Sequence, residues 1–257
     1  MSYTPNEPFT VIIPARIGST RLPNKAMADI NGQPMIAHTI RRAFESGASA
    51  VIVATDDEHI FNVAVRLGVG AVMTSTSCNS GSDRIAEAIE RLGIHPDTLI
   101  INLQGDEPCF PGHLLAELAD NFASSGASMG TIAVSDLTTS QLTDPDVVKV
   151  VADSVENALY FSRAGIPFSR DGELIENPVM RPYFMRHVGV YAYRAGYLLD
   201  FVRWGMSPLE YTEKLEQLRV LWNGGWIKLL RLDSLASHGV DTHDDLERAR
   251  HYLLSPR

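Results

Sequence analysis

Three cationic side chains follow the first apolar segment of the chain. Arg16, Arg21 and Lys25 come after residues 9–14, with spacings of five and four residues. Arginine and lysine make charge-assisted hydrogen bonds to phosphate oxygens, and the N–H groups of a loop can cradle an anion. This spacing suits an extended loop that wraps a polyphosphate. It equally suits a solvated loop whose cations balance acidic neighbours, and the spacing alone does not decide between the two.

The loop matches neither of the common glycine-rich nucleotide motifs. Gly18 and Lys25 do not fit the P-loop pattern G-x-x-x-x-G-K-[ST]. The dinucleotide fingerprint G-x-G-x-x-G is also missing, because Gly68 and Gly70 precede a predicted strand and lack the third glycine. Together with the cations, this argues against a site for NAD.

Two carboxylates occur where later strands are predicted to end. Asp106 stands in the segment QGDEP, and Asp241 stands just before the last predicted helix. Taken alone, Asp106 is a turn residue before Pro108, and Asp241 belongs to a helix start. Magnesium prefers oxygen donors and usually keeps waters and phosphate oxygens as further ligands. The two carboxylates opposite the cations of the first loop therefore favour a metal site.

These side chains need a framework that brings them together. Apolar segments predict strands at 9–14, 50–57, 71–74, 98–106 and 128–134, and amphipathic segments between them predict helices at 34–47, 58–68, 81–93 and 113–126. This alternation indicates an α/β fold with a doubly wound, mostly parallel sheet that is covered on both faces. Ligands bind at the carboxyl ends of such strands, which is where the cations and Asp106 occur.

The second half of the chain has a less regular pattern. Strands are predicted at 147–151, 158–162 and 187–193 with few helices between them, which indicates an antiparallel region in a mixed sheet. The chain is then predicted to close with a helix at 209–222, a strand at 226–232 and a helix from His243.

Composition excludes several classes of protein. The net charge of −9 argues against a broad nucleic-acid surface. The two cysteines, Cys78 and Cys109, form neither a disulfide framework nor a zinc spacing, and they fit a reducing cytosol. The N-terminus lacks the features of a signal peptide, and no apolar run approaches the roughly 20 residues of a membrane helix. We expect a cytoplasmic protein without a membrane partner.

A series of motifs runs in order along nearly the whole chain. They are VIIPARIGSTRLPNK, NGQPMIAH, VATDD, SGSDR, INLQGDEP, VKVV, ALYFSRAGIPFSRD, RHVGVYAYRAG, TEKLEQLR and GVDTHDDLERAR. Together they resemble the 3-deoxy-manno-octulosonate (Kdo) cytidylyltransferases, also called CMP-Kdo synthetases. The first motif alone would indicate only the wider group of CMP-sugar synthetases and related nucleotidyltransferases.

The resemblance implies a reaction, a cofactor and a fold. CTP and Kdo would give CMP-Kdo and pyrophosphate with Mg²⁺, for lipopolysaccharide biosynthesis. The fold would be of the nucleotide-diphospho-sugar transferase type, with a small antiparallel dimerisation region and a homodimeric assembly. Residues 1–257 would form one nucleotidyltransferase domain, in which about 165–210 serve dimerisation and sugar binding.

The resemblance also implies the site residues. The nucleotide would contact Ala15, Arg16, Arg21, Lys25, Ser80, Gly81, Asp83, Arg84 and Gln104, with Arg21 and Lys25 on the β- and γ-phosphates. Asp106 and Asp241 would hold the metal, and Arg16 and Lys25 would join them as catalytic residues. The sugar would contact Gln104, Arg163, His187, Tyr191, Glu216 and Gln217. Without the resemblance, His187, Tyr191 and Glu216 would be interpreted as structural.

Several alternatives remain open at this point. The sugar could be another 2-keto acid, such as an amino-Kdo or a sialic acid. From other classes, the chain could be a non-catalytic nucleotide-binding module or a dehydrogenase with a degenerate fingerprint. The expected mechanism is direct in-line attack of the anomeric hydroxyl on the α-phosphorus of CTP, without a protein nucleophile. No side chain stands out as a general base.

Overall fold

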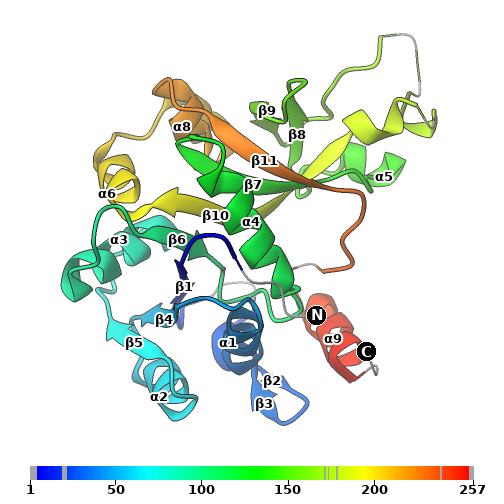
Figure 1. The fold of residues 1–257 in the computed structure, drawn as a ribbon. Coiled ribbons are helices and arrows are strands. Elements are labelled where there is room, and N and C mark those ends of the chain that lie inside the picture. The colour runs from blue at the N-terminus through cyan, green and yellow to red at the C-terminus, as the bar shows by residue number, and fades with distance from the viewer. Residues whose placement is uncertain are drawn as a thin grey trace. The chain divides into compact units, whose positions relative to one another are not determined.

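The structure of the protein is a computed structural model that describes residues 5–18, 22–170, 172, 174–177, 179–237 and 239–254 (Figure 1). The chain divides into two compact units. Unit 1 spans residues 1–120, 194–202 and 237–257, and unit 2 spans 121–193 and 203–236. The expected single domain with a dimerisation subregion at about 165–210 stays a prediction.

Unit 1 contains a parallel sheet of the predicted kind. Its strands are β1 (Phe9–Ala15), β4 (Ala50–Thr55), β5 (Gly70–Met73) and β6 (Leu99–Asn102), paired in the order β6-β1-β4-β5. Every residue of β1 is buried, because this strand lies between two others and both faces of the sheet are covered.

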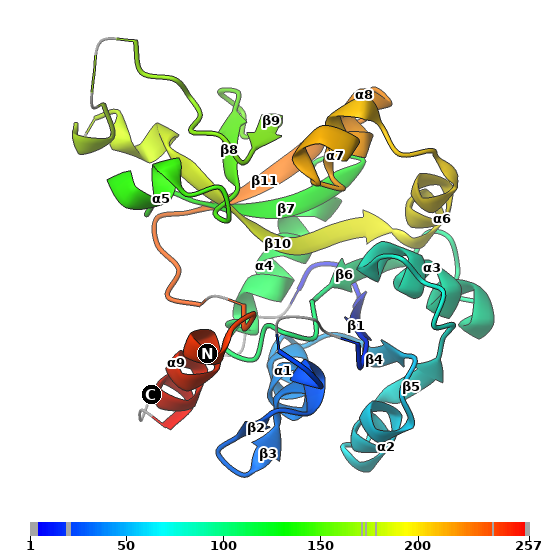
Figure 2. The same ribbon diagram turned by 180° about the vertical axis from the view of Figure 1, so that it is seen from behind.

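The helices of unit 1 flank this sheet on both faces. Helices α1 (Met35–Glu45) and α2 (Glu58–Arg66) lie on one face, and α3 (Gly81–Leu92) lies on the other, as right-handed crossovers require (Figures 1 and 2). Gly93 ends α3 with a φ of 62°, the left-handed conformation that glycine adopts most readily. The predicted doubly wound arrangement is confirmed.

Unit 2 holds the less regular part of the chain. Strand β11 (Ile227–Leu232) pairs in parallel with β7 (Met129–Val134), which pairs antiparallel with β10 (Met185–Arg194). β10 pairs antiparallel with β8 (Lys149–Ala152), and β8 with β9 (Ala158–Ser162). The predicted antiparallel portion is therefore confirmed, and the α/β class with a mixed sheet is correct.

The predicted helix at 209–222 is wrong. Two short helices, α7 (Pro208–Glu213) and α8 (Leu218–Trp222), stand in its place. Lys214 ends α7 with a φ of 55°, and the carbonyl of Glu213 accepts a hydrogen bond from Arg163 Nε at 2.8 Å. This contact from a distant segment takes a carbonyl that a continuous helix would use internally.

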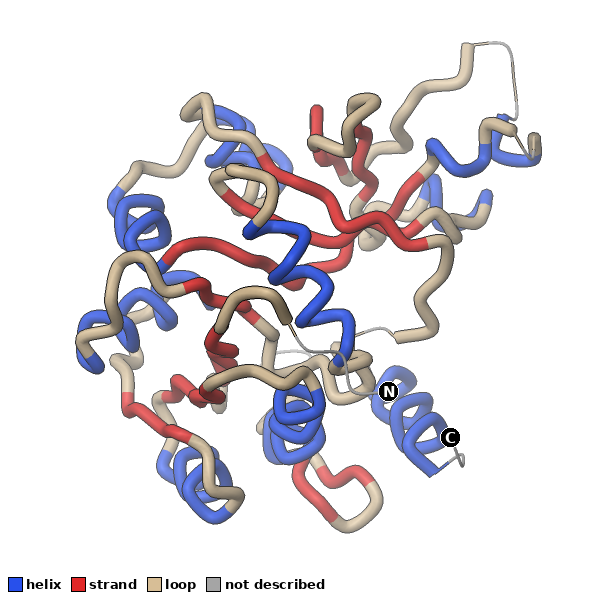
Figure 3. Tube along the Cα trace, viewed as in Figure 1, coloured by secondary structure: helices blue, strands red, loops and turns tan. Residues whose placement is uncertain are grey.

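The remaining helices and strands complete the two units, and Figure 3 colours all elements by type. They are η1 (Lys25–Met27), β2 (Asp29–Ile30), β3 (Gln33–Pro34), α4 (His113–Ala123), α5 (Thr139–Thr143), η2 (Leu174–Glu176), η3 (Arg181–Tyr183), α6 (Ala195–Arg203) and α9 (His243–Leu254). Within the described ranges, no helix combines the length and the apolar character that crossing a membrane would demand.

Candidate active site

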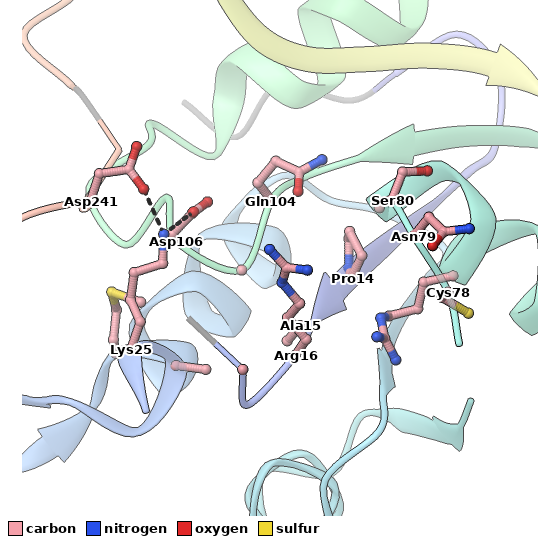
Figure 4. Close-up of a pocket in the computed structure, with 16 residues that line it drawn as sticks. Pro14, Ala15, Arg16, Lys25, Cys78, Asn79, Ser80, Gln104, Asp106 and Asp241 are labelled. Carbon is pink, nitrogen blue, oxygen red and sulfur yellow. Dashed lines mark hydrogen bonds and ion pairs between the residues drawn. The ribbon is translucent and has the colours of Figure 1, made fainter. Parts of the chain in front are cut away.

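Unit 1 has a cavity of about 290 Å³ at the carboxyl ends of β1 and β6 (Figure 4). Its walls come from four parts of the sequence: the loop after β1, the start of α3, the turn after β6 and the segment before α9. Among the lining residues are Ala15, Arg16, Lys25, Ser80, Gly81, Arg84, Gln104, Asp106 and Asp241. Most of the predicted nucleotide and metal residues are thus brought together at the predicted edge of the sheet.

A glycine lets two of these walls approach each other. The N–H of Gly105 donates to the carbonyl of Pro14 at 3.2 Å, and its carbonyl accepts from Thr39 Oγ1 at 3.0 Å. A β-carbon at Gly105 would lie 3.1 Å from the β-carbon of Ala15 and 3.1 Å from the Pro14 carbonyl oxygen. Any other residue would therefore push the turn that carries Asp106 away from β1.

Lys25 holds both predicted metal ligands. Its ammonium group donates to Asp106 Oδ2 at 2.5 Å and to Asp241 Oδ1 at 2.8 Å (Figure 4). Burial alone would lower the pKa of Lys25, but the carboxylates of Asp106 and Asp241 outweigh it and raise this pKa. The lysine is therefore a cation in this arrangement, and one positive charge is shared by two negative ones.

The start of α3 forms another wall of the cavity. Ser80 caps the helix, since its hydroxyl accepts from the N–H of Asp83 at 3.1 Å. The carboxylate of Asp83 in turn accepts from the N–H groups of Asn79 and Ser80, each at 3.1 Å. Ser80 and Gly81 line the cavity, whereas Asp83 is not among the lining residues. Asp83 thus supports the nucleotide-binding prediction only through the shape of the helix start.

Arg84 lines the cavity, but its charge is paired with a carboxylate inside the protein. Its side chain is 3% exposed, and it donates to Asp56 Oδ2 at 2.8 Å and to Thr74 Oγ1 at 2.6 Å. The other carboxylate oxygen of Asp56 accepts from the N–H of Ile17 at 3.2 Å. The pair therefore links α3 to the loop that follows β1.

Two further predicted residues of unit 1, Arg16 and Gln104, also lie at the cavity. Arg16 is exposed and lines the cavity. Gln104 also lines it, and its Nε2 donates to the buried Asn102 Oδ1 at 3.0 Å, which fixes the side-chain amide. Arg21 lies outside the described residues.

Unit 2 contains five of the six predicted sugar residues, all except Gln104, and three of them form a cluster. The rings of His187 and Tyr191 have centroids 5.5 Å apart, and the Tyr191 hydroxyl donates to Gln217 Oε1 at a long 3.4 Å. Burial raises the pKa of Tyr191, and the charge of Glu216 adds to this effect. The Nε2 of Gln217 is buried without a hydrogen-bond partner among the described residues, so it can donate to a ligand.

His187 is held as a neutral imidazole. Burial lowers the pKa of His187 to about 3. Its Nε2 lies 3.0 Å from Thr131 Oγ1, which is also within reach of the carbonyls of Val188 and Val190. Because the single hydroxyl hydrogen of Thr131 is given to a carbonyl, Nε2 is the donor to Thr131 and Nδ1 is an acceptor.

Arg163 is oriented by its own surroundings. Its Nε donates to the carbonyl of Glu213 and its Nη1 to the carbonyl of Pro145, both at 2.8 Å. The carbonyl of Arg163 accepts from Lys149 Nζ at 2.5 Å. Lys149 is fully buried, donates also to the carbonyls of Asp144 and Val147, and has a pKa lowered by burial.

Sequence reasoning missed the residues that support the predicted ones. Asp56, Lys149 and Glu213 were not expected at the site, although each bonds to a predicted residue or to its loop. Asp56 had a signal, since it directly follows the second predicted strand in the segment TDD. Lys149 and Glu213 lie in the motifs VKVV and TEKLEQLR, but their bonds to Arg163 join residues 14 and 50 positions apart and had no local signal.

Comparison with known proteins gives the family. A family model described as "Cytidylyltransferase" matches residues 10–231. The 3-deoxy-manno-octulosonate cytidylyltransferase of Tolumonas auensis is 48% identical over 245 residues, covering 95% of this chain and 96% of the relative. The chain belongs to the 3-deoxy-manno-octulosonate cytidylyltransferase family. The member from Pectobacterium carotovorum is 47% identical and covers 96% of this chain and 99% of its own.

Solved structures agree with this 3-deoxy-manno-octulosonate cytidylyltransferase assignment. A CMP:2-keto-3-deoxy-manno-octonic acid synthetase complexed with CTP is similar with a TM-score of 0.86 and 34% identity, covering 96% of this chain and 98% of that one. A 4-diphosphocytidyl-2C-methyl-D-erythritol synthase has a TM-score of 0.62 and 14% identity over 96% of this chain, which shows the shared fold alone.

Proposed function

We propose that this chain transfers the CMP group of CTP to Kdo, which gives CMP-Kdo and pyrophosphate. The observation that carries the proposal is the cavity of unit 1, where Arg16 and Lys25 are collected with Asp106 and Asp241 in a member of this enzyme family. CMP-Kdo is the activated sugar for lipopolysaccharide, so the reaction belongs to lipopolysaccharide biosynthesis. Both cysteines are free thiols, which fits a reducing cytoplasm.

The proposed chemistry is a single displacement at phosphorus. The anomeric hydroxyl oxygen of Kdo forms a bond to the α-phosphorus of CTP and loses its proton. The bond from this phosphorus to the bridging oxygen breaks, and pyrophosphate leaves with the electron pair. Arg16 lines the cavity as an exposed cation and would stabilise the charge that develops on the leaving group. Catalysis then consists mainly of positioning and charge stabilisation.

The carboxylates of Asp106 and Asp241 fit a divalent cation. They converge on one positive charge, the ammonium of Lys25, and both are oxygen donors of the type that Mg²⁺ prefers. We therefore propose that Asp106 and Asp241 hold Mg²⁺, with further oxygens coming from the triphosphate and water. When bound, this ion would compensate the charge of the triphosphate and acidify the attacking hydroxyl.

Kdo recognition is assigned to the predicted residues of unit 2. Arg163 is the proposed partner of the sugar carboxylate. Gln217 supports the assignment, because its buried Nε2 lacks a partner among the described residues and suits a sugar hydroxyl. Tyr191 and Glu216 would add a hydroxyl and a carboxylate, and His187 would contribute as a neutral ring.

We also propose a homodimer that uses residues of about 165–210. Large apolar side chains in this region are exposed in the single chain, with Phe168 at 86%, Val179 at 75% and Tyr183 at 56%. Size-exclusion chromatography with light scattering measures the assembly. A monomer at micromolar concentration would contradict this part of the proposal.

The experiment for the whole proposal is pyrophosphate release from CTP, Kdo and Mg²⁺, with ATP, GTP and UTP as competing nucleotides. Release that requires CTP, Kdo and the metal is expected. Release with CTP but only with another 2-keto sugar acid would keep the reaction type and change the substrate. CTP binding without release for any sugar would leave a nucleotide-binding module.

A further inference from the structure

The ammonium group of Lys25 occupies the space that the proposed metal site needs. It donates to Asp106 Oδ2 and Asp241 Oδ1 at 2.5 and 2.8 Å, and it points between the two carboxylates in Figure 4. Each of these oxygens gives a lone pair to the ammonium, so a divalent cation must compete with Lys25 for the same two carboxylates. Two of the three N–H donors of the ammonium are used by the carboxylates, so only one is left for a phosphate while Lys25 holds both aspartates.

We propose that Lys25 is the resident counter-cation of the nucleotide-free protein and couples divalent-cation binding to nucleotide binding. This inference rests on the proposed function. In the free protein, Lys25 holds Asp106 and Asp241 together and keeps the affinity for a divalent cation low. The triphosphate attracts Lys25 away from the carboxylates, which then become available to the cation. Because binding linkage is reciprocal, the cation must raise the affinity for CTP by the same factor.

The charge balance supports this exchange. Two carboxylates without a cation in a partly enclosed cavity would repel each other and lose hydration. Lys25 leaves one net negative charge in place of two, with side chains that are 15% exposed for Lys25, 32% for Asp106 and 46% for Asp241. When Lys25 moves to the phosphates, a divalent cation restores the balance between the carboxylates.

The test is Mn²⁺ binding without nucleotide, measured by electron paramagnetic resonance and calorimetry. Lys25→Met keeps an unbranched side chain of similar length but removes the ammonium. We expect it to bind Mn²⁺ at least tenfold more tightly than the wild type. Adding a non-hydrolysable CTP analogue should tighten Mn²⁺ binding tenfold or more in the wild type, and far less in Lys25→Met.

Arg16→Met is the matched control. Arg16 is a cation of the same cavity, and the described residues contain no hydrogen bond from it to either carboxylate. If Arg16→Met tightens Mn²⁺ binding as much as Lys25→Met does, the effect is general electrostatics and the proposal is overturned. Equal Mn²⁺ affinity in Lys25→Met and wild type also overturns it. The comparison of Mn²⁺ affinities without nucleotide tests the role of Lys25 even if the protein does not bind CTP. A failure to bind CTP would instead contradict the proposed function.

A second, independent observation concerns Asp56, which no site prediction included. Its side chain is 9% exposed and bonds to Arg84 with one oxygen and to the N–H of Ile17 with the other, at 2.8 and 3.2 Å. One carboxylate thus joins the end of β4 to the loop of Arg16 and to the start of α3. These are two of the walls that the proposed nucleotide site uses.

We infer that Asp56 is a positioning residue for the nucleotide loop. Asp56→Ala should raise the Kd for CTP at least tenfold and leave the Kd for Kdo within about twofold. Asp56→Asn should recover part of the CTP affinity, since an amide oxygen can still accept from Ile17. Arg84 remains buried without its charge partner in both variants, so measurements are made well below the melting temperature.

Asp57→Ala is the control for stability. Asp57 is the adjacent residue and caps α2 by accepting from the N–H groups of His59 and Ile60, at 2.9 and 3.0 Å. Its loss should lower the melting temperature without changing the Kd for CTP. A similar rise in this Kd in Asp57→Ala, or an unchanged Kd in Asp56→Ala, would show that Asp56 only stabilises the fold.

Discussion

The carboxylates of Asp106 and Asp241 share one hydrogen-bond donor, the ammonium of Lys25. Both aspartates belong to unit 1, but Asp106 precedes the segments of unit 2 in the sequence and Asp241 follows them. Their convergence on a single charge is the feature from which the catalytic predictions follow.

Asp106→Asn and Asp241→Asn should each abolish most of the activity. An amide has the size of a carboxylate but lacks its charge, so we expect kcat for pyrophosphate release to fall by about 10²–10³. Asp244→Asn is the matched control, since Asp244 is exposed on the first turn of α9 and does not line the cavity. Near wild-type kcat in Asp106→Asn would remove Asp106 from the mechanism.

Replacing Lys149 should raise the KM for Kdo and leave the KM for CTP unchanged. Lys149→Met leaves the carbonyls of Asp144, Val147 and Arg163 without their donor, which should lower the free energy of unfolding by about 2–4 kcal/mol. Because one of these carbonyls belongs to Arg163, we expect a higher KM for Kdo with an unchanged KM for CTP. Urea unfolding and steady-state kinetics measure the two effects. An equal rise in both KM values would argue for a general loss of structure.

His187 should make stability depend on pH in a known direction. Burial lowers the pKa of His187 to about 3, whereas the unfolded chain takes up this proton near pH 6.5. Between these values the unfolded state binds more protons, so stability contributed by neutral His187 is present above pH 6.5 and is lost as the pH falls toward 3.

Urea unfolding of wild type and His187→Asn at pH 7.5 and pH 5 measures this contribution. The stability advantage of the wild type should shrink at pH 5 by on the order of 1–2 kcal/mol. His59→Asn alters an exposed histidine and serves as the control. An advantage that is the same at both pH values would contradict the neutral state of His187.

Lys214 should tolerate glycine better than a β-branched residue. Its φ of 55° is the left-handed conformation, which costs L-residues about 1 kcal/mol and glycine almost nothing. We expect Lys214→Gly to raise the melting temperature or leave it unchanged, and Lys214→Val to lower it. A clearly lower melting temperature in Lys214→Gly than in the wild type would mean that the contact of Lys214 with the Tyr211 ring, at 4.0 Å, outweighs the backbone strain.

The sequence predicted the elements better than the contacts between them. Segments such as 9–14 and 81–93 were recognisable because periodicity and the stop at Gly93 are local properties of the chain. The break at Lys214 was not, since Arg163 reaches the carbonyl of Glu213 only in the folded protein. Hydrophobic periodicity in the sequence does not show that a distant side chain will donate to one of the helix carbonyls.

The site shows the same division. Lys25, Asp106 and Asp241 were predicted from their residue types and their places after strands or before a helix, and the motif resemblance supplied Arg84. The bonds of Lys25 to both aspartates and of Arg84 to Asp56 required the three-dimensional arrangement. Charged residues can be recognised as functional in sequence, but the partner that neutralises each of them depends on tertiary structure.

The position of Asp241 near the end of the chain has a consequence during protein synthesis. A nascent chain has made Lys25, Asp106 and all of unit 2 before residues 237–257 leave the ribosome. Until then Lys25 can bond to Asp106 but not to Asp241, and the last wall of the cavity is missing. An incomplete chain therefore cannot assemble the two-carboxylate site, and premature termination before Asp241 yields a protein without it.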